Sequence, residues 1–130
     1  MLKQRIREMI AELNVDAERS YHDNFLWIKK EALDYAFKRF HYKSFAELGC
    51  VWNIECAYGL YILEKYKAEK GVFVDTHWTE SARKRCGEYK AASVLEGNFG
   101  ESTMPELVGK VDVIILFDIL PHQVAPDWDR

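Results

Sequence analysis

Acidic side chains lie where the chain is expected to turn after its first two apolar runs. Glu47 precedes Gly49 by two residues, and Asp75 ends the next apolar run. Glycine lets a backbone turn close to a ligand, and a carboxylate can accept hydrogen bonds from two adjacent hydroxyl groups. The spacing is therefore typical of a strand, a tight turn and a helix that together hold a nucleotide-like cofactor.

The glycine turn itself departs from the usual pattern. Such turns have two or three glycines, whereas FAELGCVWNIE has Gly49 alone, with Val51 and Asn53 at the positions of the others. The absence of a full G-x-G-x-x-G argues against NAD or FAD, whose pyrophosphate needs bare backbone at the start of a helix. We expect Asn53 to replace a glycine by capping the next helix, with the Val51 side chain directed away from the ligand.

Four short apolar runs supply the strands that must position these residues. They alternate with longer amphipathic segments, which is the pattern of a parallel sheet with helical crossovers. The runs are SFAELGC, GVFVDT, ASVLEGN and VDVIILFD. Right-handed crossovers predict an α/β, Rossmann-like sheet with the strand order 3-2-1-4. The fourth run is almost wholly apolar, so we expect cover on both of its faces.

Helices are expected between these strands. Asn53 can cap a helix that reaches about Ala68, and Thr79 can cap one that ends near Cys86 or Tyr89. Ligands bind a sheet of this kind beyond the carboxyl ends of its strands, where the strand order reverses. The predicted site therefore lies between the first and fourth strands.

Two further helices are expected before the first strand. Apolar residues at helical spacing predict one over residues 2–13, and Asp23 or Asn24 can cap another that reaches about Phe40. The expected buried stripe of the second helix consists of Phe25, Ile28, Ala32, Tyr35, Ala36 and Phe40. Both helices would pack against the sheet domain.

The chain is expected to have two parts. Residues 1–43 would form an N-terminal helical segment, and residues 44–130 a Rossmann-like domain. Only four strands can be counted, and the strongest would lie at an edge, where strands are usually short and polar. We therefore expect the second part to be the beginning of a longer domain, or its fourth strand to be covered by something else, such as a second copy in a homodimer.

The region from Ser44 to Trp128 resembles the class I S-adenosylmethionine-dependent methyltransferases. FAELGC is similar to the first motif of that family, VFVDTHW to the second, and LEGNF to the segment after the third strand that lines the adenine pocket. VDVIILFDILPHQVAPDW is similar to the fourth-strand motif of members that methylate small molecules. The resemblance covers about two thirds of the chain.

The resemblance implies a site for S-adenosylmethionine. Asp75 would accept hydrogen bonds from both ribose hydroxyls, and Glu47 would meet the ammonium group directly or through water. Trp78 would pack on the adenine, although each of these residues taken singly could serve a turn, a helix end or packing. The implied cofactor-binding residues are Glu47, Gly49, Cys50, Asn53, Asp75, Thr76, Trp78, Asn98, Phe99 and Phe117.

Methyl transfer is an in-line displacement in which the protein mainly supplies proximity and orientation. If the acceptor is a hydroxyl or an amine, its proton must leave, and His122 is the best-placed base because imidazole titrates near neutral pH, with Asp118 next. His122 could equally be a structural histidine in its turn. The turn Asp118-Ile119-Leu120-Pro121 lacks the Asn/Asp-Pro-Pro-aromatic pattern of enzymes that methylate amino groups of bases, so a small-molecule acceptor is expected.

Composition narrows the partners and the compartment. The net charge of -3 and the pI near 5.8 provide no basic field for nucleic acid. Three cysteines without C-x-x-C spacing indicate neither a disulfide framework nor a metal site, so a cytoplasmic protein is expected. No segment approaches the ~18 apolar residues of a membrane span.

A function of another class stays open. The chain could be a non-catalytic binding or scaffold module that keeps the methyltransferase-like fold, has a degenerate cofactor turn, and pairs through its fourth strand and first helix. A different Rossmann-like nucleotide enzyme is a further alternative, and the single glycine of the turn argues against it.

Overall fold

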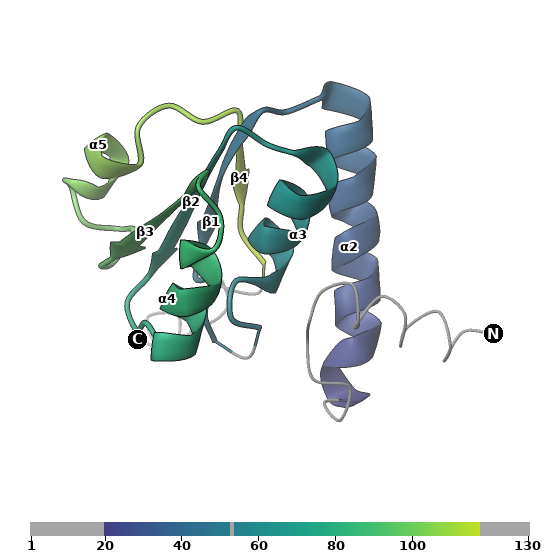
Figure 1. Ribbon diagram of the computed structural model, residues 1–130, viewed down its shortest axis with the longest axis horizontal. Helices are drawn as coiled ribbons and strands as arrows, with labels where there is room; N and C mark the ends of the chain where they lie inside the picture. Colours follow the sequence, from purple (N-terminus) through teal and green to yellow (C-terminus); the bar gives the residue numbers. More distant parts are fainter. Residues whose placement is uncertain (1–19, 53, 118–130) are drawn as a thin grey trace, which may run out of the picture.

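The computed structural model describes residues 20–52 and 54–117, with side chains placed from residue 28 onward (Figure 1). The predicted helix over residues 2–13 and the segment from residue 118 onward lie outside the described residues. In the described part of the chain, no helix is long and apolar enough to cross a membrane. The division at residue 43 stays a prediction.

A four-stranded parallel sheet forms the centre of the domain. The strands are β1 (Ser44–Leu48), β2 (Lys70–Asp75), β3 (Ala92–Glu96) and β4 (Val113–Ile115). Their order is β3-β2-β1-β4, and every neighbouring pair is parallel. The α/β class and the strand order predicted from the alternating apolar runs are therefore confirmed, because each run pairs with its neighbours as right-handed crossovers require.

Helices connect and cover the strands (Figure 1). They are α2 (Ser20–Phe40), α3 (Ala57–Tyr66), α4 (Glu80–Gly87) and α5 (Met104–Val108). The predicted cap of α4 is confirmed, since the Thr79 hydroxyl accepts a hydrogen bond from the Ala82 N–H at 3.1 Å. The predicted caps of α2 are wrong, because Asp23 and Asn24 already lie within that helix.

The start of α3 also differs from the prediction. Its first residue is Ala57, and the residue before it, Cys56, is left-handed with φ of 67° and makes no side-chain capping bond. The predicted cap, Asn53, lies outside the described residues, and the residue at the cap position is Cys56. A backbone hydrogen bond of 2.7 Å from the Cys56 N–H to the Cys50 carbonyl closes the connecting loop instead, which delays the first helical turn.

The buried side of α2 is not the one predicted. Leu33 and Phe37 are 5 % and 2 % exposed, whereas Ile28, Tyr35 and Phe40 are all more than half exposed. Apolar residues occur on several sides of this helix, so its sequence pattern does not single out one face. The orientation therefore depends on contacts with the rest of the fold.

A polar contact between α2 and α3 accompanies that orientation. Asp34, next to Leu33, accepts a hydrogen bond of 2.7 Å from the Tyr61 hydroxyl and another from the Tyr66 hydroxyl. The Lys65 ammonium lies 3.3 Å from the same carboxylate. Because the Asp34 carboxylate interacts with three donors of α3, turning α2 to bury its other apolar side would break these hydrogen bonds and the ion pair.

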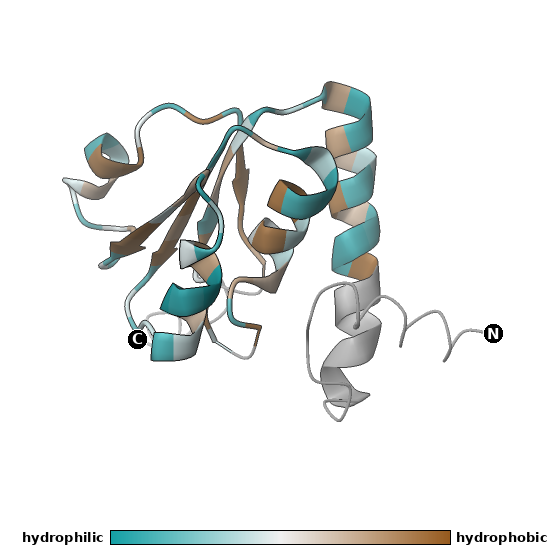
Figure 2. Cartoon of the chain, viewed as in Figure 1, coloured by the Kyte–Doolittle hydropathy of each residue, from teal (hydrophilic) through white to brown (hydrophobic). Residues whose placement is uncertain are grey.

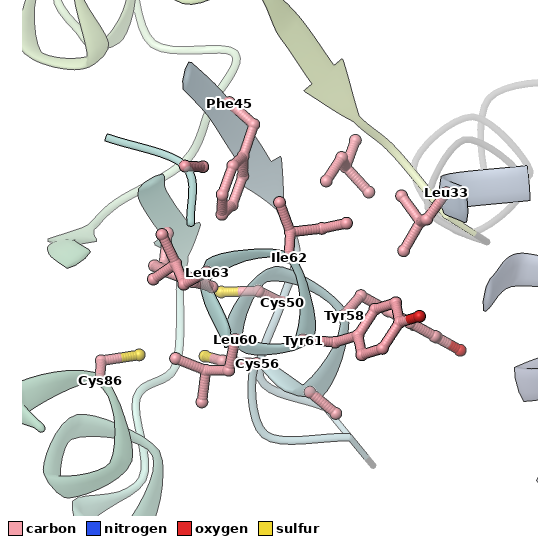
Figure 3. Packing of buried hydrophobic residues seen from close by; sticks show 14 of the residues in the cluster. Leu33, Phe45, Cys50, Cys56, Tyr58, Leu60, Tyr61, Ile62, Leu63 and Cys86 are labelled. Carbon is pink, nitrogen blue, oxygen red and sulfur yellow. The ribbon is translucent and has the colours of Figure 1, made fainter. Parts of the chain in front are cut away.

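The two faces of the sheet are covered unequally. One face packs against α2, α3 and α4 in a cluster that includes Phe45, Phe73 and Ile115 (Figure 3). The other packs Ala46, Val72 and Val74 against Met104 of α5. Strands β2, β3 and β4 are largely hydrophobic in Figure 2, as expected for parallel strands with two inner faces.

The fourth strand is shorter and more open than predicted. Only Val113–Ile115 pair with β1, at the edge of the sheet. Ile115 is 4 % exposed, but Ile114 on the other face is 59 % exposed. Among the described residues nothing packs on Ile114, because Met104 of α5 packs with Ala46, Val72 and Val74. The expected cover of this strand by a longer domain or a second copy stays a prediction.

Candidate functional site

A pocket of about 420 Å³ lies beyond the carboxyl ends of β1 and β2. It is formed by the loop between β1 and α3 and the loop between β2 and α4. Its described lining residues are Val51, Trp52, Glu55, Asp75, Thr76, His77 and Thr79. The pocket is one strand away from the predicted reversal point between β1 and β4, where the chain after Phe117 lies outside the description. Its volume is in the range of small-molecule sites.

Asp75 joins the two loops of the pocket. It is the last residue of β2, and its Oδ2 accepts a hydrogen bond of 2.9 Å from the Val51 N–H. Its Oδ1 accepts one of 3.1 Å from the His77 N–H. Each oxygen of a carboxylate has two lone pairs, so both retain the capacity to accept a further bond from a ligand.

The turn after β1 is a tight turn around Gly49, as the sequence predicts. Gly49 has φ of 67°, a left-handed conformation that glycine adopts without strain, and its N–H donates to the Val74 carbonyl at 2.7 Å. Cys50 is fully buried behind the turn. Val51 is 4 % exposed and belongs to the main core, while its N–H points to Asp75. The turn therefore presents backbone to the pocket and most of the Val51 side chain to the interior.

Glu47 faces the interior of the protein. It is 3 % exposed, and its Oε2 accepts a hydrogen bond of 2.9 Å from the Gly59 N–H in α3. Burial, with a smaller contribution from the negative charge of Asp75, raises the pKa of Glu47 to about 8, although the bond from Gly59 opposes the shift. Glu47 does not line the pocket. In this structure it links β1 to α3.

Gly59 is a residue that the sequence analysis missed. A Cβ atom built on it would lie 2.2 Å from a ring carbon of Phe73 and 2.6 Å from Oε2 of Glu47. Glycine is thus the residue that lets α3 approach the sheet and lets a backbone N–H reach Glu47. The signal was present in the sequence as a glycine within the apolar first half of a helix, ten residues after Gly49.

Three cysteines meet behind the pocket. Cys50 and Cys56 come from the loop before α3 and Cys86 from α4, and all three are buried and free (Figure 3). Burial raises the pKa of the Cys50 thiol. The pKa values of Cys56 and Cys86 are raised mainly by a hydrogen bond with a neighbouring thiol. Thiols of this kind stay protonated, so they serve packing rather than nucleophilic chemistry.

Three residues predicted to surround an adenine lie outside the pocket. Trp78 donates its indole N–H to the Leu95 carbonyl at 3.0 Å and packs on the main core. Asn98 accepts a bond of 2.8 Å from the Gly100 N–H within its own turn. Phe99 packs against the second core cluster, on the other face of the sheet. The structure therefore does not bring these side chains to Asp75.

The remaining predicted residues have mixed positions. Thr76 lines the pocket, and its hydroxyl lies 3.0 Å from Nδ1 of His77. Phe117 packs edge to face on Tyr58, with ring centroids 5.1 Å apart, away from the pocket. The two predicted bases, Asp118 and His122, lie outside the described residues.

Five described lining residues were not among the predicted site residues: Val51, Trp52, Glu55, His77 and Thr79. Trp52 is 73 % exposed, which is unusual for a side chain with so much apolar surface. Glu55 is bonded to Thr79 and to Ser81 of α4. Their positions follow from how the two loops fold together, and the only sequence signal was the tryptophan beside the glycine turn.

Comparison with known proteins gives no match to a family model, to a curated protein or to a solved structure. What the structure establishes is a small α/β domain whose parallel sheet is compatible with a Rossmann-like fold. A methyl-transfer function is therefore a proposal that depends on the sequence motifs and on the geometry of the pocket.

Proposed function

We propose that the protein binds S-adenosylmethionine in the pocket beyond β1 and β2 and transfers its methyl group to a small-molecule acceptor. The observation that carries the proposal is Asp75, a carboxylate at the end of β2 that lines the pocket and keeps acceptor capacity on both oxygens. Two adjacent ribose hydroxyls are the donor pair that such a carboxylate binds.

The charge of the pocket supports a ligand that carries no phosphate. Asp75 and Glu55 both line it, and none of its described lining residues is a lysine or an arginine. S-Adenosylmethionine supplies a methyl carbon that is activated by an adjacent positive sulfonium. Acidic side chains near such a ligand stabilise its positive charge in a site partly shielded from water.

Trp52 supports the nucleoside part of the proposal. Its ring is largely exposed and lines the same pocket as Asp75. Stacking of a base on an aromatic ring contributes about 1–3 kcal/mol in nucleic-acid-binding proteins, and the same contact would cover exposed apolar surface here. Trp52 thus replaces Trp78 as the proposed partner of the adenine.

The chain's own residues would mainly bind and orient the reactants. Gly49 and Val51 shape the turn, Asp75 holds the ribose, and Trp52 covers the base. A proton leaving the acceptor would pass to His122 or Asp118, as the fourth-strand motif implies. These last two roles remain predictions from the resemblance.

A second candidate is a non-catalytic binding module with the same fold. It is favoured by the open edge of the sheet, where Ile114 is 59 % exposed and no described side chain packs on it. Such a module would use this surface for a partner and would bind no cofactor.

The test is calorimetric titration of the chain with S-adenosylmethionine and S-adenosylhomocysteine. We expect micromolar binding of both, weakened more than fivefold, or by about 1 kcal/mol or more, in Asp75→Ala because two hydrogen bonds are lost. Trp52→Ala, at an exposed position, should weaken binding comparably without affecting the fold. Turnover would be measured as S-adenosylhomocysteine formed from S-adenosylmethionine with small acceptors.

The matched control is Glu96→Ala. Glu96 ends β3 in register with Asp75, is exposed, and forms an ion pair with Arg83 outside the pocket. Glu96→Ala should leave the affinity for S-adenosylmethionine unchanged. Unfolding curves would show whether Asp75→Ala remains folded, since Asp75 also holds the Val51 N–H. Absence of binding in the folded protein, or equal affinity in Asp75→Ala and the native chain, would contradict the proposal and favour the binding module.

A further inference from the structure

Glu55 occupies an unusual position in the loop between β1 and α3. Its backbone is left-handed with φ of 45°, although the residue is not glycine. Its side chain is 34 % exposed and lines the pocket together with Asp75. A strained backbone is retained where the surrounding contacts require it. Here the Glu55 N–H donates to the Val51 carbonyl at 2.8 Å, and the carboxylate makes further contacts.

The Glu55 carboxylate is held from the opposite loop. Its Oε1 accepts a hydrogen bond of 3.3 Å from the Thr79 hydroxyl, and its Oε2 accepts one of 2.8 Å from the Ser81 hydroxyl. The Arg85 guanidinium forms an ion pair with Oε2 at 3.9 Å, without a hydrogen bond, and does not line the pocket. The negative charge is therefore fixed in place and only partly balanced.

This arrangement differs from a phosphate-binding loop in the same fold class. Such loops direct backbone N–H groups and the start of a helix toward the phosphate. Here a carboxylate of the chain itself lies against the first residues of α4, between Thr79 and Ser81. A phosphate entering the pocket would meet Glu55 and Asp75, and no lysine or arginine among the described lining residues.

We propose that Glu55 is a specificity-determining residue that excludes phosphorylated nucleosides from the pocket and admits neutral or cationic ones. The inference rests on the proposed nucleoside site and names the class of ligand it accepts. Glu55 would act through its charge. Glu55→Gln separates that charge from the hydrogen bonds, because the amide oxygen can accept from one of the two hydroxyls and the amide N–H can donate to the other.

The experiment compares the affinity of adenosine with that of adenosine 5′-monophosphate by calorimetry. In the native chain we expect adenosine to bind about tenfold more tightly, since a doubly charged phosphate is repelled by fixed carboxylates. In Glu55→Gln the preference should fall to about threefold, chiefly through tighter binding of the monophosphate. Raising the salt concentration should reduce the preference in the native chain and have less effect in Glu55→Gln.

Glu96→Gln is the control, because it removes an acidic side chain of the neighbouring strand end outside the pocket. The Glu96→Gln variant should keep the native preference for adenosine over adenosine 5′-monophosphate. If adenosine binds but Glu55→Gln keeps the native preference and its salt dependence, the inference is overturned while the nucleoside site stands. If neither adenosine nor S-adenosylhomocysteine binds the folded native chain, both the proposed function and this inference are overturned.

Discussion

The two faces of the sheet differ in how completely they are covered, and the pocket depends on the better covered one. On the first face, Phe45 and Phe73 are 0 % exposed beneath α2, α3 and α4. On the second, α5 covers β2 and β3, and Ile114 of β4 is 59 % exposed. Packing of α3 against the first face sets where the loop before it lies, and that loop forms one wall of the pocket.

The difference shows how site and stability are connected in this domain. Glu47 and Gly59 join β1 to α3 on the first face, directly beneath the glycine turn. None of the residues in the cluster on the second face lines the pocket. Changes on the first face should therefore affect folding and the pocket together, whereas changes on the second should affect the pocket less than the stability.

The largest effect is expected for Gly59→Ala. The added methyl group would overlap the Phe73 ring and the Glu47 carboxylate, so α3 must move away from the sheet. Overpacking combined with the loss of a buried hydrogen bond should lower the free energy of unfolding by about 3–4 kcal/mol, measured by urea denaturation. Gly87→Ala is the control, since nothing lies within 4 Å of a Cβ at that position. Equal stabilities of the two variants would show that α3 does not pack as described.

Two adjacent residues of β4 compare the faces directly. Ile115→Ala removes a side chain that is 4 % exposed on the first face, and should lower the free energy of unfolding by about 2–3 kcal/mol. Ile114→Ala, on the second face, should change it by less than about 1 kcal/mol because the side chain is already in contact with water. Thermal and urea unfolding would measure both. A large loss in Ile114→Ala would indicate that another part of the chain or a second copy covers that face.

A pH dependence of the stability is expected from Glu47. In the unfolded chain its carboxyl has an ordinary pKa of 4.5, whereas burial raises the folded value to about 8. Between these values the folded protein holds a proton that the unfolded chain has lost, so the free energy of unfolding falls as the pH rises, by up to about 1.4 kcal/mol per pH unit. The stabilisation is fully present below the unfolded pKa and is lost as the pH passes the folded one.

Glu47→Gln isolates this contribution. The amide oxygen can still accept the bond from Gly59, but it does not titrate. Urea unfolding of both proteins from about pH 5 to about pH 8 should therefore show a downward slope that is smaller in the variant. Parallel curves would mean that Glu47 is ionised in the folded protein and that water or a cation reaches it.

The fold could be predicted to a large extent from the chain alone. Four apolar runs separated by helical segments leave few topologies once crossovers are right-handed, and the order 3-2-1-4 followed. The orientation of α2 could not be predicted, because the helix has apolar residues on several sides. Its contact with α3 through Asp34, Leu33 and Phe37 selects one of them.

The site was predicted in part for a similar reason. Asp75 and Gly49 were found because a strand end and a tight turn require particular residue types at those positions. Trp78 was assigned to the pocket, whereas it bonds to β3. A strand places the residue at its end, but the direction of a loop side chain several residues later depends on what the loop packs against.

What the sequence alone determined is local or periodic: the alternation of strands and helices, the glycine in a left-handed turn, and the acid that ends β2. These follow from backbone sterics and from which residues a buried strand can carry. Only the tertiary structure decided that Glu47 turns inward to Gly59 and that Glu55 and Trp52 line the pocket. Such placements arise from contacts between segments far apart in the chain, where packing and hydrogen bonding outweigh local preference.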